Sequence, residues 1–179
     1  ESHALFLGNS LPVREVDFYG SGNGSEVKLG LNRGASGIDG LVASSAGYSK
    51  GLNQPLTLLL GDLSLLHDLN SLKLISESPK PIVLIVLNNH GGGIFSFLPI
   101  SEHKDIFETY FSTPHSLEFK DAAKMFKLSY FNPESPEDFE SIYLKQASAD
   151  KSCIIEVNTL KEDNIRVQKE WTEFLHQNR

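Results

Sequence analysis

Two short polar segments of this 179-residue chain contain residue types that could bind a cation, and each follows an apolar run. Gly61-Asp62-Leu63-Ser64 comes directly after the run 56–60, and the segment 88–93 (NNHGGG) comes directly after the run 82–87. If the two runs are neighbouring parallel strands, their carboxyl ends bring Asp62 and Asn89 to one edge of the sheet, although they lie 27 positions apart. Carboxylate, amide and carbonyl oxygens are the ligands that magnesium takes in proteins. The pair therefore predicts an oxygen-rich cation site, beside a helix N-terminus whose free N–H groups suit a phosphate.

Each segment taken alone has a simpler interpretation. Asp62 could cap a helix that begins near Leu65, and the segment 88–93 could be a turn. Another glycine-rich segment, residues 20–24 (GSGNG), is interpreted as an ordinary loop, because no apolar strand leads into it and no helix opens after it. The six histidines show no metal-ligand spacing, so the sequence predicts no zinc site.

The elements that would position these residues alternate between strands and helices. Four apolar runs predict buried strands, the last of them at or near an edge: residues 4–7, 56–60, 82–87 and 153–157. Helical periodicity predicts helices over the ranges 37–50, 65–75, 136–147 and 167–175. Ser135 is the expected cap of the third helix, and Trp171 is the expected apolar anchor of the fourth. This order indicates an α/β fold, a parallel sheet flanked by helices, in a single domain over residues 1–179.

Composition excludes several classes of protein. The chain has 16 basic and 23 acidic side chains, a net charge of −7 and no basic stripe, which argues against a nucleic-acid partner. No apolar run reaches the roughly 18 residues of a membrane span. Cys153 is the single cysteine, so no internal disulfide can form. All 14 glycines lie at or before Gly93, which favours ligand-binding loops in the first half and supporting structure in the second. Because the chain starts at Glu1, we expect a piece of a longer polypeptide.

Several motifs together resemble one family. Gly61-Asp62-Leu63, then 24 residues, then Asn88-Asn89 is similar to the cofactor motif of thiamine-diphosphate enzymes, with Leu63 where glycine is usual. Residues 8–14 (GNSLPVR), 32–40 (NRGASGIDG) and 88–99 (NNHGGGIFSFLP) resemble the 2-succinyl-5-enolpyruvyl-6-hydroxy-3-cyclohexene-1-carboxylate (SEPHCHC) synthases, the MenD family of menaquinone biosynthesis. The resemblance implies the thiamine-diphosphate-binding fold, in its pyrophosphate-binding domain.

The resemblance also implies roles for individual residues. The cofactor-binding residues would be Ser36, Gly37, Ile38, Asp62, Leu63, Ser64, Asn89 and Gly91. Asp62, Asn89 and the Gly91 carbonyl would hold Mg²⁺, or Mn²⁺ in its place, against the two phosphates. Ile38 would be the apolar residue that bends the cofactor, unless it is a core residue of the helix expected over 37–50. The substrate-binding residues would be Ser10, Arg14, Arg33, Ile94 and Phe95, since arginine binds carboxylates through two parallel hydrogen bonds.

In the SEPHCHC synthases thiamine diphosphate decarboxylates 2-oxoglutarate, and the remaining unit is added to isochorismate. The glutamate that activates the cofactor lies on a pyrimidine-binding domain of a partner subunit, and no stretch of this chain resembles that domain. The resemblance thus implies the C-terminal third of a homo-oligomeric enzyme, inactive alone and with no catalytic residue of its own. It also implies a cytoplasmic enzyme, or a plastid one if the parent is a plant fusion. Two alternatives stay open: another thiamine-diphosphate decarboxylase, and a binding module without turnover.

Overall fold

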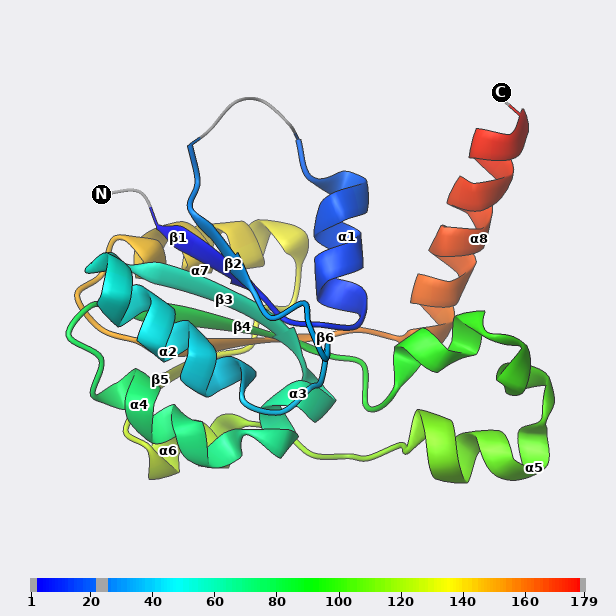
Figure 1. Cartoon of the computed structure of the whole chain (residues 1–179), viewed down its shortest axis with the longest axis horizontal. Coiled ribbons are helices and arrows are strands. Elements are labelled where there is room, and N and C mark those ends of the chain that lie inside the picture. Colours follow the sequence, from blue (N-terminus) through cyan, green and yellow to red (C-terminus); the bar gives the residue numbers. More distant parts are fainter. Residues whose placement is uncertain (1–2, 22–25, 178–179) are drawn as a thin grey trace.

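Six parallel strands form one sheet in the order β2-β1-β3-β4-β6-β5 (Figure 1). The structure, a computed structural model, describes residues 3–21 and 26–177, without the side chains of residues 162, 169, 172 and 175–177. The strands are β1 (Ala4–Leu7), β2 (Leu29–Leu31), β3 (Leu56–Gly61), β4 (Ile82–Asn88), β5 (Ser129–Phe131) and β6 (Cys153–Asn158). The four predicted strands are confirmed, and β6 lies next to the edge. The two edge strands were not predicted, because each has three residues and no fully apolar run.

The helices are of very different lengths. The α-helices are α1 (Leu11–Tyr19), α2 (Leu41–Leu52), α3 (Asp62–His67), α4 (Leu72–Ser76), α5 (Lys104–Phe107), α6 (Lys120–Met125), α7 (Pro136–Ala147) and α8 (Lys161–Gln177). Single turns of other helix types are η1 (Leu69–Ser71), η2 (Gly93–Phe97), η3 (Pro99–Glu102) and η4 (Glu108–Ser112). No helix among the described residues is both long and apolar enough to cross a membrane.

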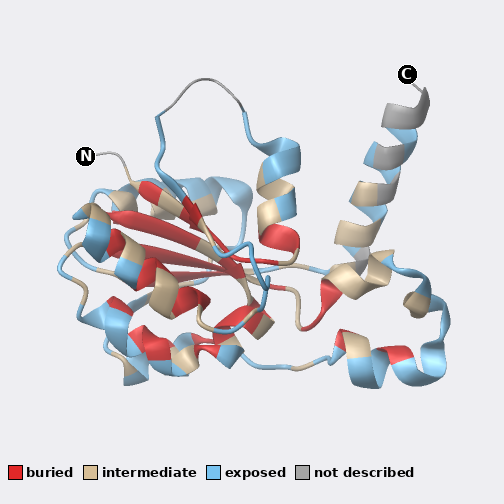
Figure 2. Ribbon diagram, viewed as in Figure 1, coloured by how far each residue is buried: buried red, intermediate tan, exposed pale blue. Residues whose placement is uncertain are grey.

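The sheet is covered on both faces, which explains why its central strands lack polar alternation. On one face α2, α3, α4 and α6 pack against Leu58 of β3, Leu84 of β4 and Ile154 of β6. On the other face α7 packs against Val83 of β4 and Ile155 of β6. Figure 2 shows the buried residues concentrated in the sheet and in the helix faces turned toward it. The strands are thereby rigidly held, and their carboxyl ends are fixed relative to one another.

Two of the predicted helices differ from those observed. The helix expected over 37–50 begins at Leu41, after Gly40, whose φ of +67° is a left-handed conformation that suits glycine. Ile38 is therefore not a residue of that helix. The helix expected over 65–75 is broken into α3, η1 and α4 at Asp68, whose carboxylate accepts hydrogen bonds from Ala43 N–H (3.0 Å) and Ser71 Oγ (2.5 Å). Polar contacts at this junction tie it to α2.

The last two predicted helices both form, but their expected cap and anchor have opposite outcomes. Ser135 caps α7 as expected, since its Oγ accepts a hydrogen bond of 3.1 Å from Asp138 N–H. In α8, the helix expected over 167–175 is confirmed, but Trp171 does not anchor it to the core, because Trp171 is 42% and Phe174 56% exposed. The helix extends away from the sheet (Figure 1), so its apolar side chains meet little of the core. The side chain of Leu175, the last of the stripe, lies outside the described residues, as do Gly22, Asn23 and Gly24 of the loop 20–24.

Candidate functional site

The residues that follow five strands surround a cavity of about 460 Å³. The register aligns the strand ends, because Leu7 pairs with Leu59, and Gly61 pairs with Leu87. Segments after β1, β2, β3, β4 and β6 all contribute to the cavity wall. The carboxyl edge of a parallel sheet is the usual ligand site of such folds, and the volume lies within the range of small-molecule pockets.

The structure brings nearly all the predicted site residues to this one cavity. They are Ser10, Arg14, Arg33, Ser36, Ile38, Asp62, Leu63, Ser64, Asn89, Gly91, Ile94 and Phe95. The exception is Gly37, which is not part of the cavity wall; its carbonyl accepts a hydrogen bond of 2.6 Å from Asn9 Nδ2. The second half of the chain also contributes, through Thr159 and Asn164, so the expectation that it only supports the site is wrong in part.

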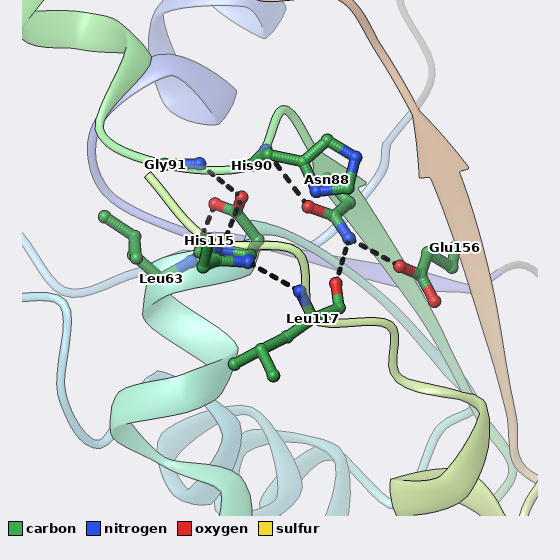
Figure 3. A network of polar contacts seen from close by, with 8 residues as sticks. Leu63, Asn88, His90, Gly91, His115, Leu117 and Glu156 are labelled. Carbon is green, nitrogen blue, oxygen red and sulfur yellow. Dashed lines mark hydrogen bonds and ion pairs between the residues drawn. The ribbon is translucent and has the colours of Figure 1, made fainter. Parts of the chain in front are cut away.

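Asp62 is buried, with 2% of its surface exposed, and its carboxylate is held by three donors (Figure 3). Its Oδ1 accepts a hydrogen bond from Leu63 N–H at 2.7 Å. Its Oδ2 accepts from Gly91 N–H at 2.9 Å and contacts His115 Nε2 at 3.1 Å. Burial raises the pKa of Asp62, and the two backbone hydrogen bonds and His115 oppose that rise. Asp62 is the first residue of α3, after the cap residue Gly61, so the simpler interpretation of Asp62 as the helix cap is wrong.

The three glycines after β4 are needed for close approach of the backbone. Gly91 has φ +146°, a conformation that L side chains rarely adopt. A Cβ on Gly91 would collide with Ser112 O, and one on Gly93 would collide with the Asn89 side-chain amide. The run 91–93 therefore leaves room for Asn89 in the cavity and brings the N–H of Gly91 to Asp62.

A buried polar network lies behind Asp62. Asn88 Nδ2 donates to Glu156 Oε1 at 2.6 Å and to Leu117 O at 3.0 Å. Glu156 Oε2 accepts from Phe119 N–H at 2.9 Å and from the Tyr130 hydroxyl at 2.8 Å. Figure 3 shows the Asn88 side chain turned toward Glu156 on β6. Of the two neighbouring asparagines, Asn89 lines the cavity and Asn88 ties β4 to β6 and to the segment that carries His115.

The oxygen atoms that face the cavity are suitable ligands for a hard cation. Asp62 and Asn89 offer carboxylate and amide oxygens to the same cavity, and these are magnesium ligands. The described part of the chain holds no group of three His, Cys, Asp or Glu side chains arranged for a metal ion. Gly91 meets Asp62 through its N–H, and its carbonyl accepts a hydrogen bond of 3.0 Å from Gly93 N–H. A carbonyl oxygen has a second lone pair, so this contact leaves Gly91 able to serve as a ligand.

The charged side chains of the cavity wall balance one another. The positive charges of Arg14 and Arg33 face the carboxyl groups of Asp62 and Glu15 across the cavity wall. Burial raises the pKa of Glu15, and a hydrogen bond from Asn164 opposes that rise. A diphosphate entering this cavity would meet the Asp62 carboxylate without any surplus of positive charge. A divalent cation at Asp62 would reverse that repulsion, because a bound ion is the largest local charge in such a site.

The arginines are positioned by the end of β1. Arg33 donates from a guanidinium nitrogen to Asn9 Oδ1 at 3.1 Å, and Arg14 donates to Ser10 O at 2.6 Å. Asn9 is buried and binds Gly37 through its other side-chain atom, so it holds the loop that carries Arg33. The apolar part of the wall includes Ile38, before α2, and Ile94 and Phe95 in η2.

Besides Thr159 and Asn164, the residues Asn9, Glu15 and His115 at the site were not predicted as functional. Asn9 and Glu15 lie in or next to the motif at residues 8–14, and this proximity is the signal that could have found them. His115 is 53 positions from Asp62, in a segment that carries no motif, so no local signal could have found it.

The comparisons with known proteins agree with this geometry. The chain is 50% identical over 167 residues to the SEPHCHC synthase of Chlorobium phaeobacteroides, and 47% over 170 residues to that of Rubrobacter xylanophilus. The resemblance to the SEPHCHC synthases is confirmed. The SEPHCHC synthase of Prosthecochloris aestuarii is 42% identical over 174 residues. These matches cover 92%, 95% and 97% of this chain, which spans only 29–30% of each relative. No family model matches the chain.

Two solved structures show the same fold. Benzoylformate decarboxylase from Polynucleobacter necessarius has a TM-score of 0.74 at 14% identity, over 90% of this chain and 30% of its own. A protein from Mycobacterium smegmatis, described as a thiamin diphosphate-dependent enzyme, has a TM-score of 0.69 at 18% identity, over 88% of this chain and 29% of its own. The expected fold class is confirmed: a parallel α/β sheet of the kind found in thiamine-diphosphate-dependent enzymes.

Proposed function

We propose that residues 1–179 form the diphosphate-binding domain of a thiamine-diphosphate-dependent SEPHCHC synthase, and supply half of its substrate site. The supporting observation is the convergence at one cavity: Asp62, Asn89 and both arginines line it, at the carboxyl edge of the sheet. The sequence similarity to SEPHCHC synthases covers the segments that carry these residues. When bound, thiamine diphosphate supplies the chemistry that removes carbon dioxide from a 2-oxo acid.

The proposal gives each side of the cavity a task. Asp62, Asn89 and the Gly91 carbonyl hold Mg²⁺, and the ion neutralises the diphosphate against the buried carboxylate. Ser36, Ile38, Leu63 and Ser64 on the wall approach the cofactor. Gly37 keeps the loop in place through its carbonyl, which Asn9 binds. Arg14 and Arg33, with Ser10, bind the carboxylates of 2-oxoglutarate and isochorismate. Ile94 and Phe95 exclude water from that side of the site.

The rest of the enzyme belongs to the proposal as well. This chain spans about three tenths of its curated relatives, so a pyrimidine-binding domain outside residues 1–179 completes the site. In this proposal the domain comes from a partner subunit, and the enzyme is a cytoplasmic homo-oligomer in menaquinone biosynthesis. The relatives named above are bacterial, and the comparisons give no support to the plastid alternative.

Replacement of Asp62 tests the cofactor site. In the complete protein, Asp62→Ala should abolish Mg²⁺-dependent binding of thiamine diphosphate, because the ion loses its carboxylate ligand. Titration calorimetry with thiamine diphosphate, with and without MgCl₂, measures the effect. Asp62 accepts three hydrogen bonds and is buried, so thermal unfolding of each variant must be recorded beside the binding.

Asp68→Ala is the matched control. Asp68 is also buried, on the same stretch of chain, and accepts a backbone hydrogen bond, but it is not part of the cavity wall. It should lower stability and leave the cofactor affinity of the folded protein unchanged. A folded Asp62→Ala protein with wild-type affinity would contradict the proposed function.

A further inference from the structure

We propose that His115 is a positioning residue for the metal site: it holds the Asp62 carboxylate so that only Oδ1 is offered to the ion. The inference rests on the proposed function, since it concerns how this chain binds Mg²⁺. His115 Nε2 lies 3.1 Å from Asp62 Oδ2, and the two side chains are 12% and 3% exposed. The contact is therefore shielded from water on both sides.

The proton position on His115 follows from its second contact. Leu117 N–H donates to Nδ1 of the ring at 3.1 Å, so Nδ1 carries a lone pair and no proton. The proton of the neutral ring then lies on Nε2, which donates to Asp62 Oδ2. The backbone amide thereby fixes the tautomer that makes His115 a donor to Asp62.

The segment around His115 is itself anchored from behind. Leu117 O accepts a hydrogen bond from Asn88 Nδ2, and Asn88 is bound to buried Glu156 (Figure 3). His115 N–H also donates to His90 O at 3.2 Å. The ring is thus held at both its backbone and its Nδ1, as expected for a residue that orients a ligand side chain.

The donors are distributed unequally over the Asp62 carboxylate. Oδ2 accepts from both Gly91 N–H and His115 Nε2, which fills its two lone pairs. Oδ1 accepts from Leu63 N–H alone and keeps one lone pair for an ion. Asp62 is therefore a one-oxygen ligand as long as His115 donates. Mg²⁺ requires a near-ideal octahedron, whereas Ca²⁺ accepts carboxylates through one or both oxygens. His115 thus favours Mg²⁺ over Ca²⁺.

A pair of variants that differ by one methylene group tests this role. The amide nitrogen of Gln can occupy the place of Nε2, whereas Asn is too short to reach Asp62. In the complete polypeptide that carries residues 1–179, with saturating thiamine diphosphate, MgCl₂ and CaCl₂ are titrated separately by calorimetry. His115→Asn should weaken Mg²⁺ binding about 10- to 100-fold, the usual loss for such partners. The loss for Ca²⁺ should be smaller, and His115→Gln should restore most of both the affinity and the Mg²⁺ preference.

His67→Asn is the matched control, because His67 is an exposed histidine on the same helix as Asp62. It should leave both metal affinities unchanged, and thermal unfolding without metal shows whether each variant is folded. Wild-type protein that binds neither metal with thiamine diphosphate would overturn the proposed function itself. If the wild type binds, any of three results overturns the role of His115: unchanged affinity in His115→Asn, no recovery in His115→Gln, or equal losses for Mg²⁺ and Ca²⁺.

Discussion

At the scale of single residues, the site separates groups that the sequence places side by side. Asn88 and Asn89 are adjacent, yet Asn88 binds Glu156 in the interior and Asn89 lines the cavity. In the same way, Asn9 is not among the predicted cofactor-binding residues, but its Oδ1 accepts a hydrogen bond of 3.1 Å from the Arg33 guanidinium. The buried Asn9 amide thus positions Arg33, and both residues line the same cavity.

Arg33→Lys tests whether the planar guanidinium is needed. Lysine keeps the charge and loses the fork that binds a carboxylate through two hydrogen bonds, so the KM for 2-oxoglutarate or isochorismate should rise. The expected loss in kcat/KM is about 1–3 kcal/mol, or roughly 5- to 150-fold, the range for a charge-assisted hydrogen bond. Steady-state kinetics of the complete enzyme measure it. Arg166→Lys, in a surface ion-pair cluster on α8, should change nothing. Unaltered kinetics in Arg33→Lys would mean that Arg33 is structural.

At the scale of elements, one buried carboxylate joins several of them. Glu156 on β6 is fully buried and accepts hydrogen bonds from Asn88 of β4, Phe119 before α6 and Tyr130 of β5. Burial and the Glu156 carboxylate raise the pKa of Tyr130, which keeps the tyrosine protonated as a donor. The segment that presents His115 to Asp62 is held at this point, so the geometry of the cavity depends on a residue outside it.

Glu156→Gln should lower the free energy of unfolding. The amide NH₂ would face at least one of the three donors, leaving a buried group unpaired, and hydrogen bonds to a charged group contribute about 1.5–3 kcal/mol each. Urea denaturation of the 179-residue chain measures the change. Glu170→Gln, which removes an exposed ion pair with Arg166, should cost under about 0.5 kcal/mol. Equal stability of the two variants would show that the buried network does not hold the elements together.

At the scale of the whole molecule, the cavity is open on the side away from the sheet. Arg14, Arg33 and Ser36 on its wall are exposed in this chain. Apolar side chains beside it are also exposed, among them Phe18 (57%), Leu98 (48%) and Trp171 (42%). Such a surface is typical of a domain that packs against another one. Water in the open cavity weakens each electrostatic contact there.

Residues 1–179 alone should therefore give no turnover. The family resemblance assigns the activating glutamate to another domain, and no carboxylate of this chain is proposed to replace it. The purified chain is supplied with MgCl₂, thiamine diphosphate, 2-oxoglutarate and isochorismate, and carbon dioxide release is followed. Adding a polypeptide that carries the pyrimidine-binding domain should restore release. A rate on the order of 1 per second without that domain would mean that this chain contains its own activating group.

The sequence by itself determined the central strands and the two polar segments that follow them. The runs at β3 and β4 are apolar on both faces, and parallel strands bring Asp62 and Asn89 to one edge whatever the details of packing. The apolar runs and the polar segments are local sequence patterns, and the rule that the carboxyl ends of parallel strands share one edge of the sheet brings the segments together. The motifs at residues 8–14 and 32–40 added the arginines, through resemblance.

Only the tertiary structure decided how those residues are held. Gly40 delays the start of α2, because its left-handed backbone precedes the helix. Asp68 breaks the helix predicted over 65–75, because its carboxylate binds α2 instead of continuing the apolar repeat. The contact of His115 with Asp62, and that of Glu156 with Asn88, join residues 53 and 68 positions apart. Hydrogen bonds between such distant residues depend on the packing of the whole sheet and leave no periodic trace in the chain, so the supporting half of the site became visible only in the fold.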